Sequence, residues 1–296
     1  MWQETCRRLG LSAVVIGLGA GGASRVDDPK DDPVALARQV LDDAKPAADR
    51  EAIIRDHPAL SAELITALTA DMKPGTDEEY RRIPWIWRVA IAAAKRAEGA
   101  EIRRILDVAL PQPENALDDW RAVVLGGGLV NGLTLVGRWP AETMDAFTKT
   151  DGDLALRWKL AIGRAVAMAD DPKVKTGTRY DALRLVGMLP WELGGAQIGR
   201  YLAKGIDAEL QQGAVGAAGD VRSPEAGQAL IAGFPHFTKE NRVFALRALL
   251  RDSARTDALL AALTDGRVSK VEARAALKEI GDDSESRKKA EQALAK

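Results

Sequence analysis

The feature that most constrains the fold is a repeat of 31 or 32 residues in the C-terminal part of the chain, between Arg179 and Asp282. Its phase is marked by small-apolar dipeptides at Ala182-Leu183, Ala214-Val215, Ala245-Leu246 and Ala276-Leu277. A fixed period of this length, built from apolar residues at helical spacing, is typical of an α-solenoid. We therefore predict an all-α fold in which stacked antiparallel helix pairs bury their apolar faces against their neighbours.

Each repeat reads as two helices. One carries segments such as NRVFALRALLRD, and its partner carries segments such as RTDALLAALTDG. Ser223 precedes a proline, and Ser269 stands three residues before Glu272, so both serines are expected to cap helix starts. Thr76 and Glu79 have the same capping-box spacing before a long apolar helix, in which Pro84 can occupy the first turn.

A weaker periodicity lies upstream of the clear repeats. Aromatic-basic pairs occur at Trp87-Arg88, Trp120-Arg121 and Trp158-Lys159, and each is followed by small and branched residues. We interpret these segments as degenerate copies of the same inward helix, which gives one continuous helical-repeat domain over residues 34–296. The run Gly126–Gly128 lies in this pattern without a preceding strand or a G-K-[ST] motif, so it favours close helix packing over phosphate binding.

The N-terminus has the order of regions found in a secretory signal peptide. Arg7 and Arg8 precede the apolar segment Leu9–Gly19, and small residues follow up to Ala23. We predict a signal peptide over residues 1–23 and a charged, proline-containing linker over residues 24–33. The alternative, a membrane anchor, is disfavoured because the apolar run falls short of the roughly 20 residues that span a bilayer. The expected location is therefore periplasmic or extracellular, with no stable membrane span after cleavage.

Charge and composition argue against several functions. The 42 basic and 43 acidic residues leave a net charge of −1, which provides no general attraction for nucleic acid. Cys6 is the one cysteine and lies in the predicted signal peptide, so thiol catalysis is not expected. His57 and His236 each adjoin a proline and lack further ligands at metal-binding spacing. We expect no metal, no cofactor and no enzymatic activity.

The candidate binding site is the densest group of arginines and aromatic residues in a chain with 5% aromatic residues. It comprises Arg81, Arg82, Trp85, Arg88, Arg179 and Tyr180. Arginine and aromatic side chains commonly anchor protein interfaces. Arg81, Trp85 and Arg88 are four and three residues apart, so we expect them on one helix face. The alternative is that the tryptophans fill an alanine-rich core while the arginines pair with nearby carboxylates.

The segment FPHFTKENRVFALRALLRDSARTDALLAALTDGRV resembles part of a known class of repeat proteins. From residue 34 onward the chain looks like HEAT-type helical-repeat proteins. This segment is similar to the repeat region of exported bacterial proteins that also carry a dehydrogenase-like propeller and a c-type haem domain. No C-x-x-C-H haem motif is present, so electron transfer does not carry over. The resemblance implies a right-handed superhelix and an exported, non-catalytic scaffold that binds a protein partner. The alternative is a helical-repeat enzyme, or an accessory subunit of an exported oxidoreductase, with its site near Trp85–Arg88.

Overall fold

A computed structural model describes residues 32–73, 75–110, 119–281 and 284–295. Over these residues the chain forms sixteen α-helices and two short 3-10 helices, η2 (Pro58–Leu60) and η3 (Phe234–His236), without a strand. The α-helices are α2 (Pro33–Val40), α3 (Ala47–Asp56), α4 (Ser61–Thr69), α5 (Asp77–Arg96), α6 (Gly99–Ala109), α7 (Asp119–Leu135), α8 (Pro140–Thr148), α9 (Gly152–Asp170), α10 (Thr176–Val186), α11 (Trp191–Tyr201), α12 (Ala208–Asp220), α13 (Pro224–Gly233), α14 (Lys239–Leu249), α15 (Ser253–Thr264), α16 (Lys270–Leu277) and α17 (Glu285–Ala295). The predicted all-α class is confirmed.

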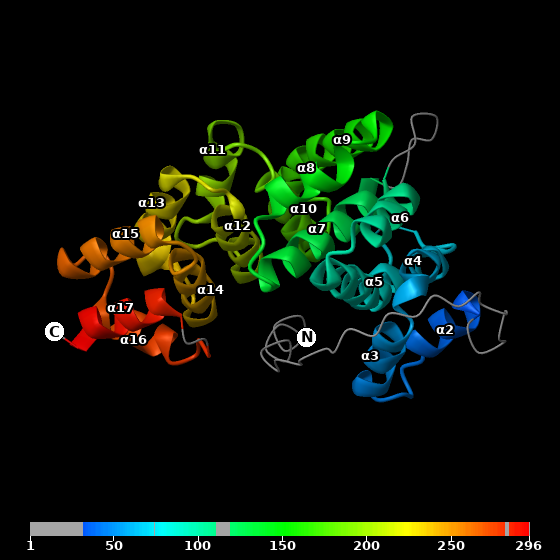
Figure 1. Ribbon diagram of the computed structural model, residues 1–296, viewed down its shortest axis with the longest axis horizontal. Helices are drawn as coiled ribbons and strands as arrows, with labels where there is room; N and C mark the ends of the chain where they lie inside the picture. The colour runs from blue at the N-terminus through cyan, green and yellow to red at the C-terminus, as the bar shows by residue number, and fades with distance from the viewer. Residues whose placement is uncertain (1–31, 74, 111–118, 282–283, 296) are drawn as a thin grey trace.

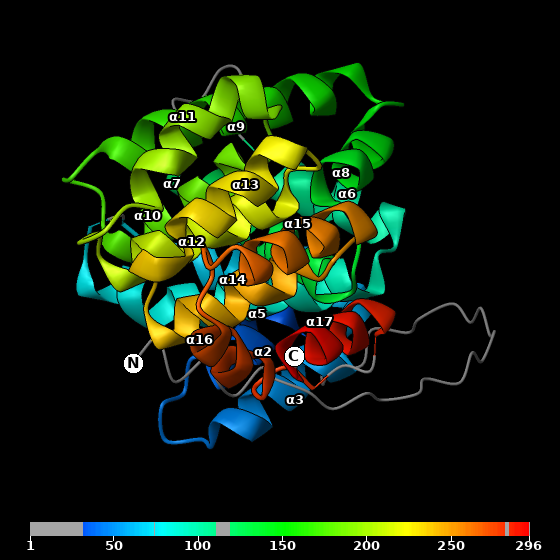
Figure 2. The same cartoon turned by 90° about the vertical axis from the view of Figure 1, so that its left-hand side faces the viewer.

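The helices form two layers along an arch (Figure 1). In the layer that we call inner, α5 packs on α7, α7 on α10, and then α10, α12, α14 and α16 follow in order. In the outer layer α4 packs on α6, α6 on α8, and α11, α13, α15 and α17 follow one another. The pairs predicted from the repeat are α10 with α11, α12 with α13, α14 with α15, and α16 with α17. Seen from the end of the arch that carries α16 and α17, these pairs lie one behind another (Figure 2).

Helix α9 interrupts the alternation between layers. It is 19 residues long and packs against α7, α8 and α10, so two consecutive helices, α8 and α9, lie between α7 and α10 in sequence. Trp87, Trp120 and Trp158, which mark the predicted degenerate repeats, lie buried on α5, α7 and α9. The tryptophans thus supply bulk in the middle of the arch.

Close approach of the inner helices depends on small residues. A Cβ added to Gly128 of α7 would lie 2.7 Å from the Cβ of Ala90 on α5, and one added to Gly132 would lie 2.5 Å from that of Ala94. These separations are far below van der Waals contact, so each glycine matches an alanine across the α5–α7 interface. All three residues of the run Gly126–Gly128 lie within helix α7. The run thus serves close helix packing, as the sequence pattern predicts.

The helix starts agree with the sequence in some places and differ in others. Ser223 and Ser269 accept hydrogen bonds from the backbone N–H groups of Ala226 and Glu272, as predicted. The predicted linker ends earlier than residue 33, since Asp32 caps α2 and Pro33 is its first residue. The predicted signal peptide and residues 24–31 of the predicted linker lie outside the described residues.

Two expectations for α5 are wrong. Thr76 caps no backbone N–H of α5, and its hydroxyl donates to the carbonyl of Lys73 instead. Glu79, the other half of the expected capping box, turns into the core and is 1% exposed. Pro84 lies inside α5 rather than in its first turn. Three acidic residues, 77–79, favour an earlier start because they interact with the positive end of the helix dipole.

Candidate interaction site

Arg81 and Arg82 tie α5 to the C-terminal ends of two neighbouring helices. Arg81 donates to the carbonyl of Leu41 at the end of α2, and Arg82 donates to the carbonyls of Leu68 and Ala70 at the end of α4. Both guanidinium groups also bind Glu78, and their hydrogen bonds, that of Arg81 first, lower the pKa of Glu78 to about 2. Carbonyls at a helix end lack partners within their own helix, so these contacts fix α2 and α4 against α5.

Trp85 lies between two guanidinium groups. The centre of the Arg50 guanidinium is 3.9 Å from the Trp85 ring centroid, and that of Arg88 is 4.7 Å away. Arg88 also donates to Glu51 on α3 at 2.8 Å. The Trp85 side chain is 6% exposed, so its faces are already covered within the chain. As the spacing predicts, Trp85 and its flanking arginines at positions 81 and 88 share a face, which is directed at α2 and α3.

The other two candidate residues lie elsewhere. Arg179 donates to the carbonyl of Ala169 on α9 and to the hydroxyl of Tyr201 on α11. Tyr180 is 4% exposed and packs with Trp87 and Ile91 of α5. Because Trp87 is two residues from Trp85, it points away from the face that carries the arginines. The structure thus does not bring the six residues into one patch: the four on α5 face α2, α3 and α4, Arg179 faces α9 and α11, and Tyr180 packs on the other face of α5. Their role in partner binding stays a prediction.

Two buried carboxyl groups lie between α5, α7 and α10, and sequence patterns gave no sign of them. Glu79 accepts hydrogen bonds from the Trp120 indole at 2.6 Å and from the Thr178 hydroxyl at 2.9 Å. Asp181 Oδ1 accepts from the Trp87 indole at 3.2 Å, while Oδ2 has no hydrogen-bond partner among the described residues. Burial raises the pKa of Asp181 well above its usual value. A carboxyl group in this setting is favoured in its neutral form.

Glu209, at the start of α12, is the other strongly shifted acid. Burial is the larger cause and Asp207 the second, and together they raise the pKa of Glu209 to about 7. A carboxyl group with a pKa near 7 is suited to proton transfer at neutral pH, and groups with shifted pKa values concentrate at functional sites. Among the described residues, however, no group of three His, Cys, Asp or Glu side chains could hold a metal ion. Glu209 does not line the pocket between α8, α11 and α13 or the pocket between α16 and α17.

Large apolar side chains are exposed on α9 and α11, which are neighbours in the arch. Leu193 is 71% exposed, Leu156 54% and Leu160 46%. Leu156 and Leu160 are four residues apart and therefore share a face of α9. Exposed charged residues, Lys159, Arg164, Glu192 and Arg200, flank these leucines, and the small exposed residues near them are Gly163, Ala167, Ala196 and Gly199. We call the three leucines and these four small residues the leucine face.

Hydrogen bonds set the register of α11 along α9. Gln197 donates to the carbonyl of Val166 at 2.8 Å, and the Tyr201 hydroxyl donates to the carbonyl of Ala169 at 2.8 Å. The two helices therefore run in the same direction. Leu193, four residues before Gln197, therefore lies level with about residue 162 of α9. The leucines of the two helices thus lie at similar positions along the parallel helix axes.

A pocket of about 300 Å³ opens beside the start of α11. It lies between the start of α8, the α10–α11 turn and the α12–α13 turn, and its walls include Trp139, Trp191 and Arg222. The guanidinium of Arg251 stacks on the Trp139 ring, 4.1 Å from its centroid. The Trp191 ring lies along its own helix, since a Cβ on Gly195 would meet the ring at 2.5 Å. Both indoles are thus held in place.

Over the described residues, no single helix is both long and apolar enough to cross a membrane. The combined segments Trp120–Leu135 and Pro140–Thr148 meet the criteria of length and composition, but they are bent by 118° relative to each other. Residues 122–130, in the first of these segments, are all buried inside the protein.

Comparisons of the chain with protein-family models, with curated proteins and with solved structures give no match. The resemblance to HEAT-type repeats and to exported dehydrogenase–cytochrome proteins therefore stays a prediction from the sequence.

Proposed function

We propose that this protein is a non-catalytic, exported helical-repeat scaffold that binds a protein partner. We further propose that its helices form a right-handed, HEAT-like solenoid. The 31- and 32-residue repeat supports the solenoid, as does the order of contacts, in which each inner helix from α10 to α16 packs on the next. The handedness follows from the resemblance to HEAT-type repeats.

The observation that carries the binding function is the leucine face. Other outer helices present polar side chains at their exposed positions, such as Arg104 on α6, Gln228 on α13 and Asp257 on α15. Single exposed leucines are common on protein surfaces, whereas large apolar side chains gathered on neighbouring elements mark interaction sites. The leucine face is therefore the best-supported partner site.

The shape of the leucine face favours a helix as its ligand. Leu156, Leu160 and Leu193 are exposed near small residues, and a Cβ added at Gly163 or Gly199 would meet nothing within 4 Å. Side chains of an incoming helix can enter the hollows above such small residues, while the leucines fill the grooves of that helix. We propose that the partner supplies the apolar face of an amphipathic helix.

The alternative function, a helical-repeat enzyme or an accessory subunit of an exported oxidoreductase, would place its site near Trp85–Arg88. The side chains there are engaged within the chain: Arg88 with Glu51, and Trp85 with the two arginines on its faces. A structural role accounts for these contacts. The scaffold is therefore favoured over the enzyme.

The test compares charged substitutions on two outer surfaces. Leu156→Glu with Leu193→Glu alters the leucine face, and Ala254→Glu with Ala261→Glu makes the same charge change on exposed positions of α15. The partner is captured with the wild-type protein, identified by mass spectrometry, purified, and titrated against each variant by calorimetry. We expect the leucine variant to lose about 2 kcal/mol or more, roughly 30-fold in Kd, while the α15 variant binds normally.

Circular dichroism provides the control for folding, because exposed substitutions usually change stability by less than about 0.5 kcal/mol. Wild-type affinity in a folded leucine variant would refute the assignment of this face. Export is tested separately by N-terminal sequencing of the protein recovered from cells, where a mature terminus between Gly21 and Arg25 is expected. A cytosolic protein that still begins at Met1 would contradict it.

A further inference from the structure

The pocket beside the start of α11 is lined by two tryptophans, and they differ in whether a cation lies on the ring. Each stands at the start of an outer helix: Trp139 immediately precedes α8, and Trp191 is the first residue of α11. Both rings are partly exposed, and both line the same pocket of about 300 Å³. The pocket therefore offers aromatic surface that the chain itself leaves partly open.

At Trp139 the chain supplies its own cations. The guanidinium centres of Arg251 and Arg222 lie 4.1 Å and 5.3 Å from the Trp139 ring centroid. Arg222 also donates to Glu142 at 3.0 Å, and these two side chains are 64% and 58% exposed. An indole ring, a guanidinium and a carboxylate thus meet at one side of the pocket.

The same combination occurs at Trp85. The guanidinium of Arg88 lies 4.7 Å from the Trp85 ring centroid and pairs with Glu51 at 2.8 Å. The face of an indole attracts cations through its quadrupole, and a neighbouring carboxylate adds to that attraction. An indole beside a carboxylate is therefore a favourable place for a cation in this protein.

At Trp191 the ring and the carboxylates are present, but no described residue places a cation over the ring. One face of the ring lies on its own helix, where a Cβ added to Gly195 would be 2.5 Å from Cε2 and 2.6 Å from Cδ2. The other face is turned away from α11. Glu192 and Asp145 line the same pocket, and both are exposed without an ion pair to a described residue.

The exposed charges on the pocket wall are mainly negative. Three are carboxylates, Glu142, Asp145 and Glu192, and one is the guanidinium of Arg222, which leaves a formal charge of −2. Asp220 also borders the pocket, but its carboxylate is buried and bound by two arginines. The wall therefore attracts cations and repels anions.

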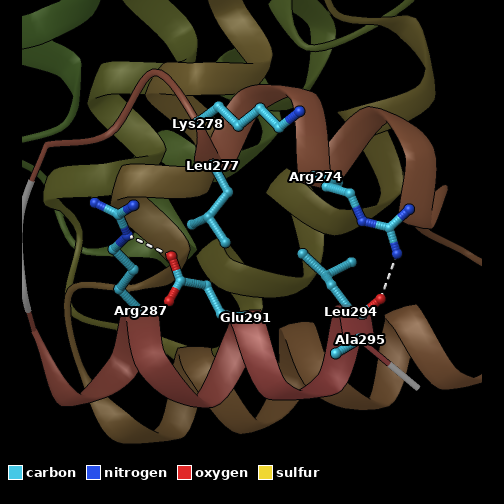
Figure 3. Close-up of a pocket in the computed structure, with 7 residues that line it drawn as sticks. All are labelled: Arg274, Leu277, Lys278, Arg287, Glu291, Leu294 and Ala295. Atoms are coloured by element: carbon cyan, nitrogen blue, oxygen red, sulfur yellow. Dashed lines mark hydrogen bonds and ion pairs between the residues drawn. The ribbon is translucent and has the colours of Figure 1, made fainter.

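The pocket between α16 and α17 lacks this combination (Figure 3). Its apolar residues Leu277 and Leu294 are 4% and 3% exposed, so they are already covered within the chain. Arg287 pairs with Glu291 at 3.0 Å, and no aromatic residue is among those that line it. An aromatic ring with an open face is thus found at the pocket beside α11 and not at this one.

We propose that the pocket beside α11 binds a small organic cation with an alkylated ammonium group. The ammonium lies over the open face of Trp191, and Asp145 and Glu192 balance its charge. Its alkyl groups contact the apolar part of the wall, which includes Leu189. A pocket of about 300 Å³ is at the lower end of the range for ligand sites, which suits a single small ion. This ligand site is a function beyond protein binding and does not depend on the leucine face.

Choline and its uncharged isostere, in which a carbon atom replaces the nitrogen, test the class of ligand on the full chain. The two molecules have the same shape, so they differ only in the charge that the rings and carboxylates would recognise. Saturation-transfer NMR titrations give the Kd of each. We expect choline to bind at least about tenfold more tightly than the isostere. Glucose, a neutral ligand rich in hydroxyl groups, should not compete with choline.

Two pairs of conservative substitutions locate the binding. Asp145→Asn with Glu192→Gln removes the two carboxylates proposed to balance the ligand. Asp257→Asn with Glu285→Gln removes two exposed carboxylates from α15 and α17, outside the pocket. We expect the first pair to weaken choline binding at least about tenfold and the control pair to change it less than about twofold. Trp191→Leu should weaken choline binding as strongly as the first pair.

Arg222→Gln separates a cation from other ligands by the direction of its effect. It removes a competing cation from the pocket and releases Glu142, so choline binding should tighten by about threefold. A saccharide or an anion would instead lose a hydrogen-bond donor and bind more weakly. Because Arg222 is exposed, this variant is expected to keep the wild-type fold.

Three outcomes would overturn the proposal. Equal binding of choline and its isostere would show that the charge is not recognised. Equal effects of the two carboxylate pairs would mean that Asp145 and Glu192 do not bind the ligand and that Glu192 only offsets the dipole of its helix. Weaker choline binding by R222Q would contradict the competition between cations. Circular dichroism checks the fold of each variant, and the exposed pair D145N with E192Q decides the outcome if W191L melts early.

Discussion

Asp220 offers a sharp test of how the middle of the arch is held together. Its carboxylate is fully buried and binds Arg184 at 2.5 Å and Arg251 at 2.7 Å, and it also accepts a hydrogen bond from Thr134. It therefore joins α7, α10, α12 and the end of α14. The Arg184 side chain is 3% exposed and passes so close to Gly216 that an added Cβ would lie 1.6 Å from its Nη1. A guanidinium confined in this way cannot move into water.

Asp220→Asn keeps the size of the side chain and removes the charge that compensates the two arginines. Removing one partner of a buried ion pair costs about 3–5 kcal/mol, because the other charge is left buried. For a domain of this size each kcal/mol lowers Tm by about 2–4 °C, so we expect Tm to fall on the order of 10 °C. Urea unfolding followed by circular dichroism at 222 nm gives the corresponding free energy.

Glu142→Gln is the matched control. Glu142 pairs with Arg222 at 3.0 Å between different helices, but the two side chains are 58% and 64% exposed. Exposed pairs contribute about 1 kcal/mol or less. If D220N and E142Q lose similar amounts of stability, the buried ion network does not hold the inner helices and the reasoning is refuted.

Two further predictions concern the candidate residues of α5 and the buried acid. Arg81→Ala with Arg88→Ala should lower the melting temperature, since both arginines bind other helices; loss of partner binding without loss of stability would instead support the interface predicted from the sequence. Asp181→Asn should be as stable as the wild type in acid and should become progressively more stable than the wild type as the pH rises above about 3.8. Because the folded-state pKa of Asp181 is raised, its contribution to the stability of the wild type is fully present below the unfolded-state pKa. That contribution is lost as the pH rises toward the folded-state pKa. Urea midpoints of both proteins between pH 4 and pH 8 measure this difference, and a gap that is constant with pH would contradict the burial argument.

The helix pairs from α10 to α17 could be predicted because their apolar residues repeat with one period and their starts carry local signals such as Ser223 and Ser269. The start of α5 could not be predicted in the same way, because Pro84 is tolerated inside a helix whose acidic first turn and neighbours favour an earlier start. The buried positions of Glu79 and Asp181 were also hidden from the sequence. Their partners, Thr178 and Trp87, lie 99 and 94 residues away along the chain, so only the fold brings them together.

The leucine face shows why periodicity alone cannot identify a binding surface. One side of α9 carries Leu154, Trp158 and Ile162, and another carries Leu156 and Leu160 beside exposed Arg164, so its large apolar residues are not confined to one face. Large apolar residues on a second face of a helix are expected to pack against a further neighbour. In the structure α9 has 19 residues and its neighbour α11 has 11, and the hydrogen bonds from α11 reach only the C-terminal part of α9. The N-terminal part of α9 therefore presents leucines that the outer layer does not cover. Burial of these leucines requires a surface from outside the described helices, which is what a partner helix would provide.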